Sequence, residues 1–310
     1  MNIAEPFSQK KLFGINNHLL EFIRLYKTNN YPNKILLSGS KGIGKSTLAY
    51  HFINYVLSED EHYKYDIDNF EINFKRLSYK TILNKSNVNL IVINNKAKNK
   101  SIDIKQIRDL INNLNKSSFN IKPRFVLIDN IELLNKNSIN ALLKVLEEPN
   151  ENVHFILINN NKNILPTLLS RCINYKIKIT NKECLEIINQ IFDNKLNDLI
   201  NPDLVTYYST PGNIHNLLKF ADQYKYDLLN LDLKKLIMLI IKENHYKKDL
   251  FVKNMLFYLI ELYFRKLSSP FSIEINKKYS YFIQKIYDTK NFNLDEESLF
   301  IEFNEEILNG

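Results

Sequence analysis

Cysteine is the residue type whose scarcity excludes most. The 310-residue sequence has only two cysteines, Cys172 and Cys184, and none in residues 58–100. Two cysteines in separate segments cannot form a disulfide framework, and they fall short of the roughly four nitrogen or sulfur ligands that structural zinc needs. We therefore expect no zinc site and a reducing compartment, the cytoplasm.

Long apolar runs are also missing. No run approaches the roughly 18 apolar residues needed to cross a membrane, and the start of the chain lacks the continuous apolar stretch of a secretory signal. Hydrophobic residues still make up 45% of the chain and charged residues 25%, which is typical of a soluble globular protein. The length suits a core of average size with one or two smaller domains.

Arginine is rare among the basic residues. Only six of the 42 are arginine, and the lysines are scattered without a dense basic run. The net charge of +8 fits a protein that works close to nucleic acid. Dispersed charge is more often a solvated surface, however, so we give this charge little weight.

The first half of the chain alternates short β-branched runs with longer amphipathic runs, the pattern of a parallel α/β sheet. Nearly every residue of the expected strands is apolar, as in strands that helices cover on both faces. These strands are residues 35–38, 89–93, 125–128 and 153–158. Helices are expected between them, at residues 46–57, 104–114 and 138–146.

After about Thr180 the strand pattern stops, and apolar residues recur at helical spacing. Residues 209–213 include Pro211 and Gly212, which predicts a turn between helices. The expected fold is an α/β core with a parallel sheet flanked by helices, followed by a small helical lid and an all-α C-terminal domain. The expected domains are residues 1–179, 180–226 and 227–310.

A phosphate-binding motif lies between the first expected strand and the helix that follows it. The segment matches G-x-x-x-x-G-K-[ST] in a strand–loop–helix context, which is what confirms such a motif. The glycines let backbone N–H groups point at phosphate oxygens, and the helix adds its positive N-terminal end. Lys45 would reach the β- and γ-phosphates, and the Ser46 hydroxyl would hold Mg²⁺. ATP and Mg²⁺ are thus the expected cofactors. The expected nucleotide-binding residues of the loop are Gly39, Ser40, Lys41, Gly42, Ile43, Gly44, Lys45, Ser46 and Thr47.

The expected strand at 125–128 ends in the acid that such a site needs. A carboxylate at Asp129 would complete the Mg²⁺ shell. Active ATPases of this kind carry Glu at the next position, where it polarises the attacking water, whereas this chain has Asn130. An amide cannot accept a proton, so general-base help, typically a factor of ~10²–10⁴, is lost. Glu132 is either a replacement that swings back or, as we favour, a solvated loop acid.

The stretch from Phe125 to Cys172 closely resembles the clamp-loader ATPases of DNA polymerase III, which are P-loop proteins of the AAA+ class. The Ser-Arg-Cys tripeptide that ends at Cys172 is a marker of that family. Together the matches follow the family's order over residues 10–180, and beyond about residue 225 they rest on helical pattern alone. The segments that carry the resemblance are NSINALLKVLEEP at 137–149, ILPTLLSRC at 164–172 and KKLFG at 10–14, which looks like the family's segment beside the adenine.

Within this family the chain looks most like the delta-prime subunit, which hydrolyses little ATP. Asn130 replaces the catalytic Glu, and Gly212 stands where motor subunits have a sensor arginine. The resemblance implies that Arg171 acts in trans, in a neighbour's catalytic site. It also implies gamma/tau and delta subunits as partners in a hetero-pentamer, with the C-terminal helices forming its collar. The sliding clamp and primer–template DNA would be partners of that complex, and no membrane is involved.

Two other functions stay open. One is an active motor subunit of the gamma/tau type in the same loader, which ATP turnover by the purified chain would distinguish. The other is a different AAA+ ATPase acting on DNA junctions, against which the Ser-Arg-Cys and LLKVLEEP segments argue. Arg171 also has a simpler possible role, as a clamp on nearby carbonyl groups.

Several further residues carry expectations of their own. Asn159 and Asn160 end a strand beside the phosphate loop, and either would serve as a polar sensor of the γ-phosphate. Cys172 is expected to pack as a small buried residue rather than react. The C-terminal aromatic residues are expected to form helical core rather than to stack on bases; they are Tyr258, Tyr263, Phe264, Tyr281 and Phe282.

Overall fold

The computed structural model divides the chain into two compact units. The N-terminal unit comprises residues 2–191 with residues 210–212, and the C-terminal unit comprises residues 192–209 and 213–310. The residues that the structure describes are 5–94, 101–116, 120–148, 152–192, 196–206, 209–267, 273–292 and 294–309.

A parallel sheet of five strands forms the centre of the N-terminal unit, in the order β2-β3-β4-β1-β5. The four strands predicted from apolar runs are all present, with ends within one residue of those expected. The strands are β1 (Lys34–Ser38), β2 (Leu90–Ile93), β3 (Arg124–Ile128), β4 (Val153–Asn159) and β5 (Ile173–Lys176).

Strand β5 was not predicted. It pairs with β1 at one edge of the sheet, and its side chains are exposed except for the half-buried Tyr175. A short strand at the edge of the sheet, with mostly exposed side chains, has no continuous apolar run. Such a run is the signal that revealed the other four strands.

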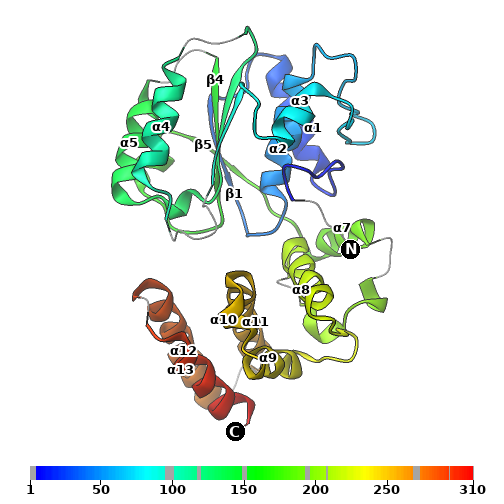
Figure 1. Cartoon of the computed structure of the whole chain (residues 1–310), viewed down its shortest axis with the longest axis vertical. Helices are drawn as coiled ribbons and strands as arrows, with labels where there is room; N and C mark the ends of the chain where they lie inside the picture. Colours follow the sequence, from blue (N-terminus) through cyan, green and yellow to red (C-terminus); the bar gives the residue numbers. More distant parts are fainter. Residues whose placement is uncertain are drawn as a thin grey trace. The chain divides into compact units, whose positions relative to one another are not determined.

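Helices cover both faces of the sheet, with α1, α2 and α3 on one face and α4 and α5 on the other (Figure 1). Side chains alternate along a strand. Ile35 and Leu37 of β1 therefore pack with α1 and α2, whereas Leu36 packs with α4 and α5 on the other face. The helices of this unit are α1 (Asn16–Lys27), α2 (Lys45–Leu57), α3 (Leu77–Leu83), α4 (Ile104–Leu114), α5 (Lys136–Glu147), α6 (Pro166–Leu169) and α7 (Asn181–Ile191), with the short turn η1 (Ile131–Leu133).

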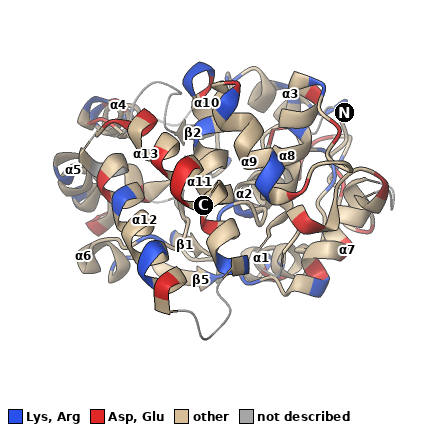
Figure 2. Ribbon diagram, turned by 90° about the horizontal axis from the view of Figure 1, so that it is seen from below, with Lys and Arg blue, Asp and Glu red and all other residues tan. Residues whose placement is uncertain are grey.

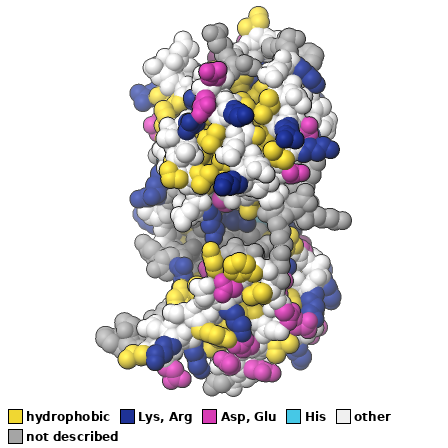
Figure 3. Space-filling model, turned by 90° about the vertical axis from the view of Figure 1, so that its left-hand side faces the viewer, with side chains coloured by type: hydrophobic (Ala, Val, Ile, Leu, Met, Phe, Trp, Pro, Cys, Tyr) yellow, Lys and Arg dark blue, Asp and Glu magenta, His cyan; other side chains and the backbone are white. Residues whose placement is uncertain are grey.

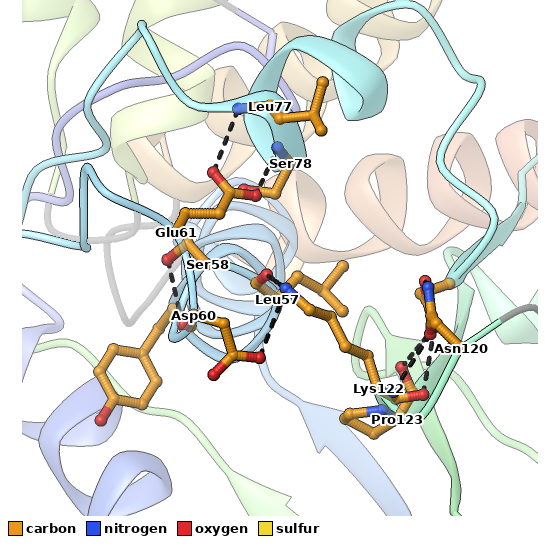
Figure 4. A network of polar contacts seen from close by, with 11 residues as sticks. Leu57, Ser58, Asp60, Glu61, Leu77, Ser78, Asn120, Lys122 and Pro123 are labelled. Carbon is orange, nitrogen blue, oxygen red and sulfur yellow. Dashed lines mark hydrogen bonds and ion pairs between the residues drawn. The ribbon is translucent and has the colours of Figure 1, made fainter.

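Polar contacts hold the segment between α2 and β2, which has no cysteine (Figure 4). The Glu61 carboxylate accepts hydrogen bonds from the N–H groups of Leu77 and Ser78, at 3.1 and 2.9 Å, and so satisfies the start of α3. Lys122 donates to the carbonyl of Leu57 at 2.7 Å. In the described part of the chain no three His, Cys, Asp or Glu side chains gather as a metal site requires. The absence of zinc stays a prediction.

The C-terminal unit is helical throughout its described residues. Its helices are α8 (Pro211–Tyr224, whose first two residues belong to the N-terminal unit), α9 (Leu233–Lys242), α10 (His245–Lys248), α11 (Leu250–Leu267), α12 (Ile273–Phe292) and α13 (Glu296–Phe303), with the short turns η2 (Leu196–Asp198), η3 (Pro202–Leu204) and η4 (Asn304–Leu308). The predicted α/β core followed by a helical region is confirmed. The finer division at residues 179 and 226 stays a prediction.

The predicted turn at residues 209–213 is wrong, because Pro211 and Gly212 form the first turn of α8. Proline suits that position: its fixed φ matches the helix, and its missing N–H would have no helical partner there. Proline followed by glycine therefore marks the start of a helix in this chain rather than a break between two helices.

The C-terminal aromatic residues divide between core and surface. Phe264 and Phe282 are 1% and 0% exposed, and their ring centroids lie 5.8 Å apart, as expected for helical core. Tyr258 and Tyr263 are half-buried. For Tyr281 the expectation is wrong, since it is 48% exposed and its hydroxyl donates to the Glu302 carboxylate at 2.6 Å.

Charged side chains of both signs are spread over the surface. Figure 3 shows lysine, arginine and acidic residues interspersed on the face that it displays, and Figure 2 shows both signs on α12 and α13, where Lys285 pairs with Glu302. This distribution fits a solvated lysine-rich surface. Among the described residues, no helix is both long enough and apolar enough for a membrane span.

Candidate nucleotide site

The predicted phosphate loop connects the end of β1 to the start of α2. Gly44 precedes α2 with a φ of 95°, in the left-handed region that glycine adopts at no steric cost. This conformation turns the chain so that the first N–H groups of α2, which have no helical partners, face the loop. Ser46 and Thr47 are half-buried in that first turn, and Lys41 is exposed on the loop.

Lys45 lies inside the loop rather than on the surface. Its side chain is 3% exposed, and Nζ donates to the carbonyl oxygens of Gly39 at 2.9 Å and Ser40 at 2.6 Å. An ammonium has three N–H donors, so one remains for a ligand. Burial lowers the pKa of Lys45 to about 8, although the charges of Asp129 and Glu132 act in the opposite direction.

Asp129 follows the last residue of β3. Its N–H donates to the carbonyl of Ile93 at 2.9 Å, which extends the pairing of β3 with β2. Burial raises the pKa of the Asp129 carboxyl, whereas the N–H of Asn130 and the charge of Lys45 lower it. The structure thus places the predicted acid within the electrostatic range of the phosphate-loop lysine.

Strand β4 lies between β1 and β3, so the residues at its end lie between the phosphate loop and Asp129. Asn159 closes a local turn, donating to the carbonyl of Lys162 at 2.9 Å and accepting from its N–H at 3.1 Å. Asn160 instead donates from Nδ2 to Oδ1 of Asn130 at 2.8 Å and to Oε1 of Glu132 at 2.9 Å. Of the two sensor candidates, Asn160 is the one directed at the acidic end of β3.

Glu132 is not the solvated loop acid that we expected. Asn130 adopts a left-handed conformation, with φ 58° and ψ 57°, and precedes the short turn η1. This turn brings the half-buried Glu132 side chain back against β4, where Oε2 also accepts from the N–H of Asn160 at 3.4 Å. Asparagine tolerates left-handed backbone better than other residues with a Cβ, and this was the available sequence signal.

Thr210, just before α8, and Gly212, in its first turn, contact the phosphate loop directly. Thr210 Oγ1 donates to the carbonyl of Lys41 at 3.0 Å, and the N–H of Gly212 donates to the carbonyl of Gly42 at 2.9 Å. A Cβ on Gly212 would lie 2.6 Å from Cα of Gly42, a distance that real side chains do not reach. Any side chain at position 212, arginine included, would therefore require the backbone to move.

The segment before α1 also lies beside the loop. Leu12 and Ile15 are 2% and 3% exposed, and Cδ1 of Ile15 lies 3.1 Å from the place that a Cβ on Gly44 would occupy. The KKLFG segment at residues 10–14 thus leads directly into the surroundings of the phosphate loop.

The Ser-Arg-Cys segment follows α6. Arg171 donates from Nε to Oε1 of Glu147 at 3.1 Å, from Nη2 to the same oxygen, and from Nη1 to the carbonyl of Thr167 at 2.8 Å. These partners belong to α5 and α6. The side chain remains 31% exposed, so the guanidinium is held but accessible. Cys172 packs against the hydrophobic cluster of α4 and α5, and burial raises the pKa of its thiol to about 11, which disfavours the reactive thiolate.

Comparison with known proteins places the chain in a family. The family model described as DNA polymerase III, delta subunit, matches residues 15–181, more than half of the chain. The DNA polymerase III subunit gamma of Buchnera aphidicola subsp. Acyrthosiphon pisum is 30% identical over 149 residues, which are 48% of this chain and 39% of that protein. The DNA polymerase III subunit delta' of Buchnera aphidicola subsp. Baizongia pistaciae is 37% identical over 89 residues, 28% of this chain and 26% of that protein.

The chain therefore spans less than half the length of these two curated relatives. A solved structure of a DNA polymerase III gamma subunit-related protein from Thermotoga maritima has a TM-score of 0.51 and 16% identity, and the match covers 90% of this chain and 96% of that one. At this identity the likeness shows the fold alone. With the family model matched from residue 15 to residue 181, and with gamma and delta' subunits among its relatives, the chain belongs to the DNA polymerase III clamp-loader family.

Proposed function

We propose that the chain is a delta-prime-type subunit of a DNA polymerase III clamp loader, a subunit that binds ATP with Mg²⁺ and hydrolyses it poorly. The observation that carries the proposal is a complete phosphate loop beside Asn130, which stands where an active ATPase of this family has glutamate. The direct contact of Gly212 with Gly42 supports it, because this arrangement has no room for the sensor arginine of a motor subunit.

The residues of the site fit a magnesium nucleotide. Lys45 has a remaining N–H donor for a phosphate oxygen, and the start of α2 supplies unpaired backbone N–H groups. The Ser46 hydroxyl and the Asp129 carboxylate are the oxygen ligands that Mg²⁺ prefers. When bound, Mg²⁺ would neutralise charge on the phosphates.

In this proposal Arg171 works outside its own chain. It would reach the nucleotide of a neighbouring subunit and stabilise charge on the phosphoryl group in transfer. The partners would be gamma/tau and delta subunits in a cytoplasmic hetero-pentamer, held together in part by the C-terminal helices. That assembly would then act on the sliding clamp and on primer–template DNA.

A second candidate is an active motor subunit of the same loader. Matches to gamma and tau subunits favour it, and so does Glu132, an acid that the structure directs toward the site. The missing glutamate at Asn130 and the glycine at position 212 count against it.

ATP turnover by the isolated chain distinguishes these two candidates. We expect the purified protein to bind a fluorescent ATP analogue with Mg²⁺ and to turn over far more slowly than ~1 s⁻¹, the lower end of ordinary enzyme rates. We also expect it to co-purify with gamma/tau and delta subunits. Turnover near 1 s⁻¹ without partners would assign the chain to the motor class instead.

Nucleotide affinity should also depend on pH through Lys45. Burial lowers the pKa of Lys45 to about 8, so without bound phosphate the ammonium is largely neutral above pH 8. Phosphate favours the charged form and raises this pKa, so binding above pH 8 takes up a proton, and affinity falls by up to about tenfold per pH unit. Below pH 8 the lysine is already charged and contributes no such slope. Calorimetric titration in two buffers of different ionisation enthalpy measures the proton uptake directly, and Lys182→Ala, the loss of an exposed lysine of α7, should leave that uptake unchanged.

A further inference from the structure

The end of β4 connects Glu132 to the phosphate loop. In the pairing of β1 with β4, Asn159 is opposite Ser38, so Asn160 lies alongside the start of the loop. Asn161 confirms this proximity, since its Nδ2 donates to Oγ of Ser40 at 3.4 Å. Because Asn160 binds both carboxylate oxygens of Glu132, that carboxylate is fixed at the same edge of the sheet as the loop.

The charge of Glu132 also acts on the site. It raises the pKa of Lys45 and of Asp129, the two ionisable groups expected to contact the nucleotide and its metal ion. Asn130, by contrast, presents an amide, which cannot take a proton. Among the described residues at the end of β3, Glu132 is thus the carboxylate other than Asp129 that lies within electrostatic range of Lys45.

A purely structural role would not require this charge. The shorter bond, from Nδ2 of Asn160, could be made to an amide oxygen at position 132, and only the 3.4 Å bond from its N–H uses the second oxygen. A carboxylate held by Asn160 beside the phosphate loop, next to an amide at position 130, points to chemistry rather than to packing.

We propose that Glu132 is the general base of this chain's slow ATP hydrolysis and replaces the glutamate that is missing at Asn130. The inference rests on the proposed nucleotide site. The water oxygen forms a bond to the γ-phosphorus, and the bond from that phosphorus to the bridging oxygen breaks, so that ADP leaves with the electron pair. Glu132 accepts the proton of the water and releases it to solvent. Its hydrogen bonds to Asn160 compete with the water, which keeps hydrolysis slow.

Single-turnover hydrolysis of labelled ATP, with enzyme in excess, tests this role. Glu132→Gln keeps the size of the side chain and one of its two bonds to Asn160 but removes the base, so hydrolysis should fall by ~10²–10⁴, the usual contribution of a positioned base. Glu132→Asp, which keeps a shorter carboxylate, should retain part of the rate. Glu186→Gln, the same change on an exposed residue of α7, should match wild type.

Binding of a fluorescent nucleotide and the melting temperature are measured on every variant, and any change in Glu132→Gln should be far smaller than the change in rate. Hydrolysis by Glu132→Gln at the wild-type rate would overturn the proposal. So would a wild-type chain that binds ATP but hydrolyses it no faster than the uncatalysed reaction, or a rate loss that follows lost affinity or lost folding. If the wild-type chain binds no nucleotide, the proposed function itself fails, and that result is distinct from all of these.

Discussion

Lys45→Ala is expected to abolish detectable nucleotide binding. Lys45 is the buried cation of the loop, and its remaining N–H donor has no equivalent in alanine. Truncating one partner of a buried charge pair typically costs ~2–5 kcal/mol, which corresponds to a loss of about 30-fold to several thousandfold in affinity. Titration with a fluorescent ATP analogue in the presence of Mg²⁺ measures the loss.

Two further variants show whether the loss of binding comes from the lost charge or from a disturbed loop. Lys41→Ala removes the same charge from an exposed residue of the same loop and should weaken binding only slightly, since exposed charges are screened by water and salt. Lys45→Met keeps most of the buried stem and should lose binding as completely as the alanine variant. If either Lys45 variant binds like wild type, the loop is not a phosphate site, however well its sequence matches.

The position of the loop between β1 and α2 could be predicted from sequence because the features that mark it are local. The spacing of Gly44 and Lys45, a buried strand before them and a helix after them are all contiguous in the chain. The four apolar strands could be predicted for a related reason. Helices cover both faces of the sheet, so nearly every residue of an inner strand must be apolar.

The contacts that shape the candidate site could not be predicted in the same way. The bonds from Asn160 to Asn130 and Glu132 join residues about 30 positions apart, and they depend on one left-handed residue after β3. The close approach of Gly212 to Gly42 spans an even longer separation and depends on where α8 begins. Sequence showed that an arginine was missing at position 212, but only the packing shows that none fits.

Arg171→Ala is expected to slow the assembled loader while leaving the isolated chain unaffected. An arginine supplied across an interface typically raises phosphoryl transfer by ~10³–10⁵ at the site that it serves. A ring with several catalytic sites would lose this help at only one of them, so DNA- and clamp-stimulated turnover of the whole complex should fall in part. Arg171→Lys should rescue poorly, because an ammonium lacks the planar fork of donors.

The contacts of Arg171 in the free chain define the controls. A guanidinium has five N–H donors, and three are used by Glu147 and Thr167, so two remain for phosphate oxygens without breaking these bonds. Glu147→Gln should therefore cost less turnover than Arg171→Ala, since it loosens the arginine without removing it. Arg108→Ala, a loss of an exposed arginine on α4, should match wild type. Normal turnover in a complex assembled with Arg171→Ala would mean that Arg171 only ties α6 to α5, whereas a complex that fails to assemble would assign it to the subunit interface instead.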